Sequence, residues 1–186
     1  MVATTPQKMT VEEFPKLPED GVRRFLINGI VWEEGMSYRS MEHTHVTTRV
    51  AKFLDNWRDT QPRPNGLVLS GDAGFRLDAD TAIGADVAYV TPELISDRPD
   101  DSRVIHGVPP LVAEILSLSD TTELIQEKIA TYMAAGVAIL WIINPYSETV
   151  IVHRPGRRPT FVNADEELTA EPVLPGFRVA VADLFR

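Results

Sequence analysis

Apolar residues recur along the chain with two different spacings, which predict helices in some segments and strands in others. Apolar positions three or four residues apart predict one helix between Met41 and Trp57 and another between Thr121 and Ala135. Shorter apolar runs bounded by turn residues predict strands. These runs are 24–27, 30–32, 67–69, 74–77, 86–90, 111–116, 138–143, 149–153 and 160–162.

Turn and cap residues divide these elements. Residues 10–13, Thr-Val-Glu-Glu, form a capping-box sequence, which predicts a further short helix that ends near Pro15. Asn28-Gly29 lies between two apolar runs, and both residues tolerate the positive φ of a type I′ turn, so the pair predicts a hairpin. Gly136 is expected to end the helix before it.

The order of the elements predicts the fold class. It fits neither a series of regular βαβ units nor an all-β protein. We expect a single α/β domain over residues 1–186, in which a mixed central sheet is flanked by helices and preceded by an N-terminal helix and hairpin.

Composition narrows the classes of function. The chain of 186 residues is 44% hydrophobic and 24% charged, as is usual for a globular domain. It has no cysteine, which excludes disulfides, a thiol nucleophile and cysteine-bound metal centres. No apolar run approaches the ~20 residues of a membrane span, and no secretion signal opens the chain, so we expect a cytoplasmic protein. A Gly-rich phosphate loop is also missing from the sequence, which leaves nucleotide-binding functions without support.

The net charge matters for any nucleic-acid substrate. It is −9, from 18 basic and 27 acidic residues. Lys and Arg contacts to phosphate normally supply most of the affinity for DNA, so this balance opposes DNA binding. A metal-dependent nuclease can carry such a charge, because its carboxylates bind the metal and a local groove can still be basic.

Two carboxylates interrupt apolar runs of the predicted sheet. Glu114 lies within Leu111–Leu116, where a carboxylate is costly to bury unless a metal, a cation or a proton compensates it. Asp86 opens the run 86–90. If the two strands are neighbours, both carboxylates point into one cleft, and two oxygen ligands with open water positions suit Mg²⁺ or Mn²⁺. Lys128, on the following helix, would reach back to orient or activate a water molecule there.

A structural role explains the same residues. Asp86 would then cap a turn, and Glu114 would pair with Lys128 or an arginine, because ion-pair networks also place charges inside proteins. The residue types alone leave both interpretations open.

A family resemblance favours the chemical interpretation. The segments that carry it are 74–77, 85–90, 110–117, 127–132, 136–137 and 140–145, with Thr10–Phe14 at one end of the chain and 174–177 and 184–185 at the other. In their order and spacing they resemble the Uma-type "putative restriction endonuclease" family of bacteria, which belongs to the PD-(D/E)xK nuclease superfamily. The resemblance implies the restriction-endonuclease-like fold.

The resemblance also implies roles for individual residues. Asp86 matches the acid of the family's Pro-Asp motif, although Ala85 replaces the proline. Glu114 matches the second acid, and the backbone carbonyl of Ile115 would be a further metal contact. Leu116 stands where the wider superfamily has a lysine, so Lys128 on the next helix is its counterpart. DNA is the implied substrate, and a homodimer is implied because paired cleavage of a duplex often uses two sites.

Some positions depart from the family pattern. Phe25, Asn28 and Ile30 stand in the hairpin where acidic residues are usual, and Asn144 stands where an Asp is common. These changes put any extra metal ligand from the hairpin in doubt.

Two further polar residues could approach the site. His43 matches a position that is often His in the family, but we interpret it as a helix-start or buried hydrogen-bonding residue. For Asp72 we expect a role in a turn.

We therefore predict a metal-dependent endonuclease that hydrolyses phosphodiester bonds in DNA. Asp86, Glu114 and the Ile115 carbonyl would hold Mg²⁺ or Mn²⁺, and Lys128 would position the attacking water. The alternative is a non-catalytic dimeric binding or scaffold module that retains the nuclease fold, which the acidic composition and the altered hairpin favour. A third hypothesis is a metal-dependent hydrolase of a small phosphorylated substrate.

Overall fold

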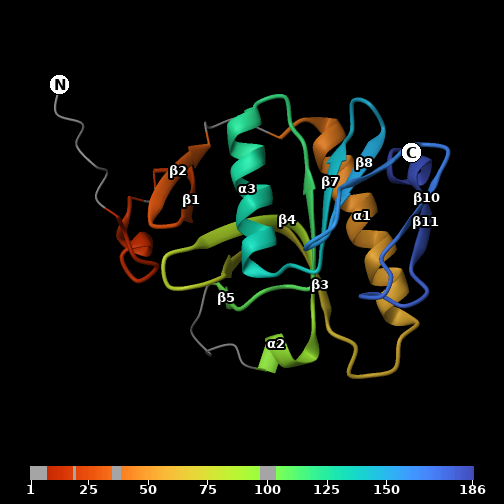
Figure 1. Cartoon of the computed structure of the whole chain (residues 1–186), viewed down its shortest axis with the longest axis horizontal. Coiled ribbons are helices and arrows are strands. Elements are labelled where there is room, and N and C mark those ends of the chain that lie inside the picture. The colour runs from red at the N-terminus through yellow and green to blue at the C-terminus, as the bar shows by residue number, and fades with distance from the viewer. Residues whose placement is uncertain (1–7, 19, 35–38, 97–103) are drawn as a thin grey trace.

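A mixed β-sheet with a helix on each face organises the chain (Figure 1). The computed structural model describes residues 8–18, 20–34, 39–96 and 104–186. The helices are η1 (Phe14–Lys16), α1 (Met41–Asp59), α2 (Pro92–Ser96), α3 (Thr122–Ala135) and η2 (Val181–Leu184), where η marks a 3₁₀ turn. The strands are β1 (Arg23–Ile27), β2 (Ile30–Glu34), β3 (Leu67–Arg76), β4 (Ala82–Val90), β5 (Ile105–His106), β6 (Leu111–Ile115), β7 (Ile139–Asn144), β8 (Thr149–His153), β9 (Thr160–Val162), β10 (Glu167–Thr169) and β11 (Arg178–Ala180).

The central sheet joins segments that are distant in the sequence. Its strand order is β2-β1-β4-β6-β7-β8-β9, and β3 pairs with both β4 and β5. β6 and β7 are parallel and are connected through α3, whereas β4 runs antiparallel to β6. β10 and β11 form a separate two-stranded sheet. The sheet is therefore mixed, as the element order predicted.

Alternating side chains of the sheet fill two hydrophobic cores. One core joins α1, through Val46, Val50 and Leu54, to residues of β4, β6 and β7 such as Val87 and Leu111. The other core joins α3 to the opposite face of the same strands; it includes Leu124, Tyr132, Val112, Leu140 and Ile142. Because successive strand residues point to opposite faces, Glu114 shares the α3 face with Val112.

The hairpin turn and the helix end that the sequence predicted are present in the structure. Ile27 pairs with Ile30 across a two-residue turn, and Asn28 and Gly29 have the positive φ values of 52° and 77° that the turn requires. The Thr121 side chain caps α3 by accepting the Leu124 N–H. Gly136 ends α3 with a φ of 92°.

Two predicted elements differ from the observed ones. The predicted N-terminal helix is only the 3₁₀ turn Phe14–Lys16, because Pro15 and Pro18 leave no room to extend it. The runs 67–69 and 74–77 are parts of one strand, β3, whose register to β4 shifts between Ser70 and Ala73. This shift is a β-bulge, which inserts extra residues without ending the strand.

Within the part of the chain that the structure describes, no helix combines the length and the apolarity needed to cross a bilayer.

Candidate functional site

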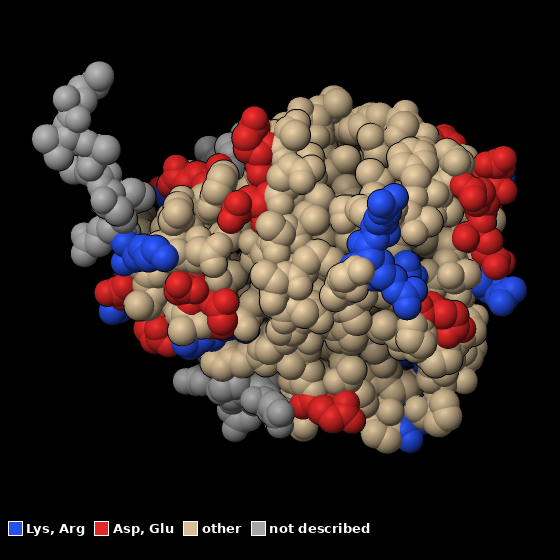
Figure 2. Space-filling model, in the orientation of Figure 1, with Lys and Arg blue, Asp and Glu red and all other residues tan. Residues whose placement is uncertain are grey.

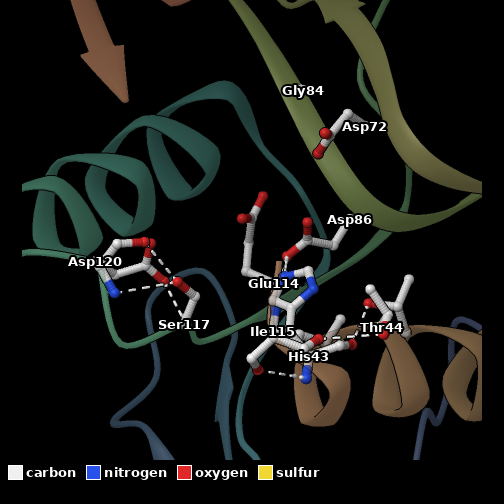
Figure 3. A network of polar contacts seen from close by, with 12 residues as sticks. His43, Thr44, Asp72, Gly84, Asp86, Glu114, Ile115, Ser117 and Asp120 are labelled. Carbon is white, nitrogen blue, oxygen red and sulfur yellow. Dashed lines mark hydrogen bonds and ion pairs between the residues drawn. The ribbon is translucent and has the colours of Figure 1, made fainter. Parts of the chain in front are cut away.

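Strands β4 and β6 bring the two predicted acids together. The last aligned pair of their antiparallel ladder is Val87 with Ala113, and Asp86 and Glu114 each lie one residue further on, facing one another across the two strands. Their side chains are buried, with residue exposures of 4% and 5%. The Ile115 N–H donates to Asp86 Oδ2 at 2.9 Å, which fixes Asp86 against the β6 backbone. Figure 3 shows the two carboxylates side by side.

Helix α3 supplies two partners for Glu114. Lys128 and Tyr132 are four residues apart and so share one face of the helix. Lys128 Nζ donates to Glu114 Oε2 at 2.8 Å, and the Tyr132 hydroxyl donates to Oε1 at 2.8 Å. The Tyr132 hydroxyl also lies 3.2 Å from the Gly84 carbonyl oxygen of β4. Both oxygens of Glu114 thus have partners, which offsets much of the cost of burying this carboxylate.

Burial dominates the acidity of Glu114. It raises the pKa of this carboxyl to about 7, against the positive charge of Lys128 and the hydrogen bonds from Lys128 and Tyr132, which lower the pKa. The nearby negative charge of Asp86 adds to the effect of burial, and the pKa of about 7 is the result of all these influences together. Glu114 therefore titrates near neutral pH.

Helix α1 contributes His43 at its first turn. Ser40 caps this helix by accepting the His43 N–H, and the ring Nε2 of His43 lies 3.3 Å from Asp86 Oδ2. Burial is the largest influence and lowers the pKa of His43, but the hydrogen bond and the charge of Asp86 outweigh it, so the pKa is raised. Burial likewise raises the pKa of Asp86, but the effects of His43, the Ile115 N–H and Lys128 outweigh it, so this pKa is lowered.

A second cation approaches Asp86 from the hairpin. Nη2 of Arg23, the first residue of β1, contacts the Asp72 carboxylate and lies 3.9 Å from Asp86 Oδ1. Its guanidinium carbon lies 5.1 Å from the centre of the Phe25 ring. Lys128 Nζ lies 4.6 Å from the same ring centre, so Phe25 contacts both cations.

The donor set fits a hard divalent cation. Two carboxylates from adjacent strands and the neighbouring Ile115 backbone are oxygen donors, which Mg²⁺ prefers, and Mg²⁺ usually keeps several waters beside one or two carboxylates. Among residues 8–18, 20–34, 39–96 and 104–186, no group of three or more His, Cys, Asp or Glu side chains could hold a metal. A metal at this site would therefore rely on Asp86, Glu114 and the Ile115 carbonyl, together with water.

The structure brings together all four residues predicted for the site. Ile115 donates to Asp86 and Lys128 donates to Glu114, and Glu114 and Ile115 are consecutive residues of β6, so the two pairs lie side by side. Their roles in metal binding and catalysis stay predictions. Glu114 does pair with Lys128, as the structural interpretation required, whereas Asp86 lies in β4 and does not cap a turn.

The other polar residues near the site were predicted less well. His43 is buried and hydrogen-bonded as expected, but its partner is Asp86 itself. Asp72 lies in the β3 bulge rather than in a turn between strands. Tyr132 and Arg23 were missed, although the spacing of Tyr132 from Lys128 was a usable signal. No local signal placed Arg23 at the site, because its partners Asp72 and Asp86 lie far along the chain.

The fold and site together define a class of protein. A mixed sheet flanked by helices is the restriction-endonuclease-like fold, and in this chain it carries two acids on adjacent strands and a lysine from the covering helix. The chain belongs to the Uma2 family, described as "Putative restriction endonuclease", whose model matches residues 11–182. The fold class and the family predicted from the sequence are thereby confirmed.

A solved structure supports the fold independently. The chain resembles "a putative nuclease belonging to DUF820 from Anabaena variabilis ATCC 29413", with a TM-score of 0.79 and 20% sequence identity. The likeness covers 95% of this chain and 97% of that one. The comparison with curated proteins found no match.

Proposed function

We propose that this protein is a metal-dependent endonuclease that hydrolyses phosphodiester bonds, with DNA as its substrate. One observation carries the proposal: two buried acids on adjacent strands, Asp86 and Glu114, lie beside the Lys128 ammonium, which is 2.8 Å from Glu114. Buried ionisable groups with shifted pKa values gather at functional sites more often than elsewhere. Family membership supports a nuclease over other hydrolases.

Each residue of the site has a chemical task in this proposal. Asp86, Glu114 and the Ile115 carbonyl would hold Mg²⁺ or Mn²⁺, and the bound ion would stabilise the negative charge that develops on the phosphate. The Lys128 ammonium, held at Glu114 Oε2, would donate a hydrogen bond to the attacking water and orient it toward phosphorus. Tyr132 would keep Glu114 in place through Oε1.

A cleavage assay tests the proposal. Supercoiled plasmid is incubated with the purified protein in Mg²⁺ or Mn²⁺, beside Asp86→Ala, Lys128→Ala and the control Lys52→Ala, an exposed lysine on α1. We expect nicking by the wild type and by Lys52→Ala, and a loss of about 100-fold or more in the two site variants. Equal background nicking in all four proteins would contradict an endonuclease.

The metal site is tested separately by calorimetric titration. We expect binding of Mg²⁺ or Mn²⁺ to the wild type and weaker binding to Glu114→Gln, which removes one anionic ligand with little change in shape. Unchanged affinity in this variant would contradict the assignment of Glu114.

Two observations favour a second function. The site acids already have cationic partners, because Lys128 contacts Glu114 and both His43 and Arg23 approach Asp86, and the net charge of −9 opposes DNA. These features favour a non-catalytic dimeric binding or scaffold module. Absence of metal binding together with absence of nicking would support it, and hydrolysis of a small phosphate ester without nicking would support the third hypothesis.

We also propose that the endonuclease acts as a homodimer in the cytoplasm. A homodimer has two sites, one for each strand of a duplex. Light scattering of the purified protein measures the oligomeric state.

A further inference from the structure

We propose that Arg23 binds the phosphate of the substrate that is cleaved, and that Asp72 holds the Arg23 guanidinium in position for this contact. The inference rests on the proposed nuclease function and adds a substrate-binding residue to it. Arg23 is not one of the residues expected to bind the metal or to position the water.

Arg23 lies at the site without belonging to the acid pair. It starts β1, and its side chain lies on the same face of the strand as Phe25, over whose ring the guanidinium sits at 5.1 Å from the centre. Its Nη2 contacts Asp72 and is 3.9 Å from Asp86 Oδ1. That separation is beyond a hydrogen bond but within strong electrostatic range.

Accessibility distinguishes Arg23 from the other cations at the site. Its side chain is 21% exposed, compared with 9% for Lys128 and 5% for His43. A phosphate that arrives from solvent therefore meets Arg23 more readily than the two buried groups. A guanidinium is also better suited than an ammonium to this contact, because its planar N–H fork matches two phosphate oxygens at once.

The backbone of β3 is shaped to hold Arg23. Asp72 lies in the bulge with a φ of 64°, a conformation that residues other than glycine rarely adopt, and Gly71 before it has a φ of 81°. Bulges beside active sites re-aim a side chain, and here the re-aimed carboxylate meets the guanidinium. Asp72 itself is 44% exposed, so this ion pair sits at the edge of the site rather than inside it.

The position of Arg23 gives it opposite effects on two ligands. Its positive charge near Asp86 attracts a phosphate and repels a divalent cation. Removal of this charge should therefore weaken DNA binding but leave metal binding unchanged or tighter. A purely structural role of Arg23 would instead weaken both together.

The experiment measures both affinities on the same variants. They are Arg23→Ala, Arg23→Lys, Asp72→Asn and the control Arg24→Ala, whose side chain pairs with Asp20 and Glu33 on the other face of β1. Calorimetry gives the Mn²⁺ affinity, and fluorescence anisotropy gives the affinity for a labelled DNA duplex in Ca²⁺ at fixed ionic strength. Thermal denaturation verifies that each variant is folded.

We expect Arg23→Ala to weaken DNA binding about 10-fold or more, because a charge-assisted hydrogen bond to phosphate is lost. Its Mn²⁺ affinity should be equal to or higher than that of the wild type. Arg23→Lys should recover part of the DNA affinity, Asp72→Asn should lose part of it, and Arg24→Ala should match the wild type.

Two results would overturn the inference. The first is that Arg23→Ala and Asp72→Asn bind DNA as tightly as the wild type, while the wild type binds metal and nicks plasmid. This result would exclude Arg23 as a phosphate ligand but leave the nuclease proposal intact. The second is a parallel loss of DNA and metal affinity in Arg23→Ala. A wild type that binds neither ligand would instead end the nuclease proposal, and this inference with it.

Discussion

The charge state of Glu114 depends on its neighbours. Burial raises its pKa, Lys128 and Tyr132 lower it, and the result is about 7. A substitution at Lys128 or Tyr132 therefore changes the fraction of Glu114 that is ionised near neutral pH.

The Tyr132 hydroxyl is expected to stabilise the fold through Glu114. Tyr132 is fully buried and donates to Glu114 Oε1, so Tyr132→Phe leaves the packing intact but removes that hydrogen bond. We expect a loss of about 1–3 kcal/mol in the free energy of unfolding, the usual cost of leaving a buried acceptor unpaired. Urea denaturation measures it, with Tyr146→Phe, an exposed tyrosine, as control. Equal stability of the two variants would show that the Tyr132 hydrogen bond contributes nothing.

Metal affinity is expected to fall as the pH decreases through about 7. A metal ligand must be ionised, and the pKa of Glu114 is raised from 4.5 to about 7, so protons compete with the metal below that pH. The apparent affinity should fall about tenfold per pH unit there, and binding should release a proton. Calorimetry in buffers of different ionisation enthalpy measures both quantities. An affinity that stays constant between about pH 6 and pH 8 would contradict this pKa as the controlling one.

At the scale of elements, the β3 bulge sets which side chain of β3 meets Arg23 of the β1–β2 hairpin. Gly71 and Asp72 both adopt positive φ, and the register shift there directs the Asp72 carboxylate to Arg23. The bulge thus connects β1, β3 and β4 at the edge of the site.

Gly71→Ala tests this bulge. A Cβ at position 71 would meet no atom within 4 Å, so its cost comes from the φ of 81° alone. We expect a loss of about 1–2 kcal/mol in the free energy of unfolding, as for an L-residue held in the left-handed region. Urea denaturation measures it. Since Gly156 has a φ of 67° and equally open space, Gly156→Ala is the matched comparison and should cost about the same. No change in either variant would mean that these turns relax to accommodate a Cβ.

The sequence predicted those elements that are marked by a pattern within their own residues. It missed the features that depend on how distant strands pair. Helical spacing located α1 and α3, and Asn28-Gly29 located the first hairpin, because each signal lies within the element itself. The β3 bulge was read as two strands, since nothing in 67–77 reveals that both halves pair with β4. Asp86, Glu114 and Lys128 could be predicted from buried charge and family pattern. Arg23 could not, because its partners lie 49 or more positions away in the chain.

At the scale of the whole molecule, charge restricts how DNA can be held. The net charge is −9, and the face in Figure 2 carries scattered basic side chains with acidic ones beside several of them rather than one continuous basic surface. This face therefore offers no broad basic surface for a phosphate backbone. We expect contacts at the site itself to supply the positive charge.

Binding of DNA should consequently depend weakly on salt. With Arg23 as the main phosphate contact, the slope of log affinity against log salt should be about −1, far shallower than for basic DNA-binding proteins. Arg23→Ala should reduce the slope by about one unit. Anisotropy titrations across a range of salt concentrations measure it. A steep slope in the wild type would point to an extended basic surface elsewhere on the molecule.

The parallel pair β6 and β7, joined through α3, has a consequence for how the site is encoded. Glu114, Lys128 and Tyr132 all come from this one continuous stretch, so their mutual spacing is set by neighbours in the chain. Asp86, His43 and Arg23 arrive from three separate segments and meet it only when the sheet is complete. Half of the site therefore lies within one continuous segment of the chain. The other half is in place only when the remaining segments have folded against that segment.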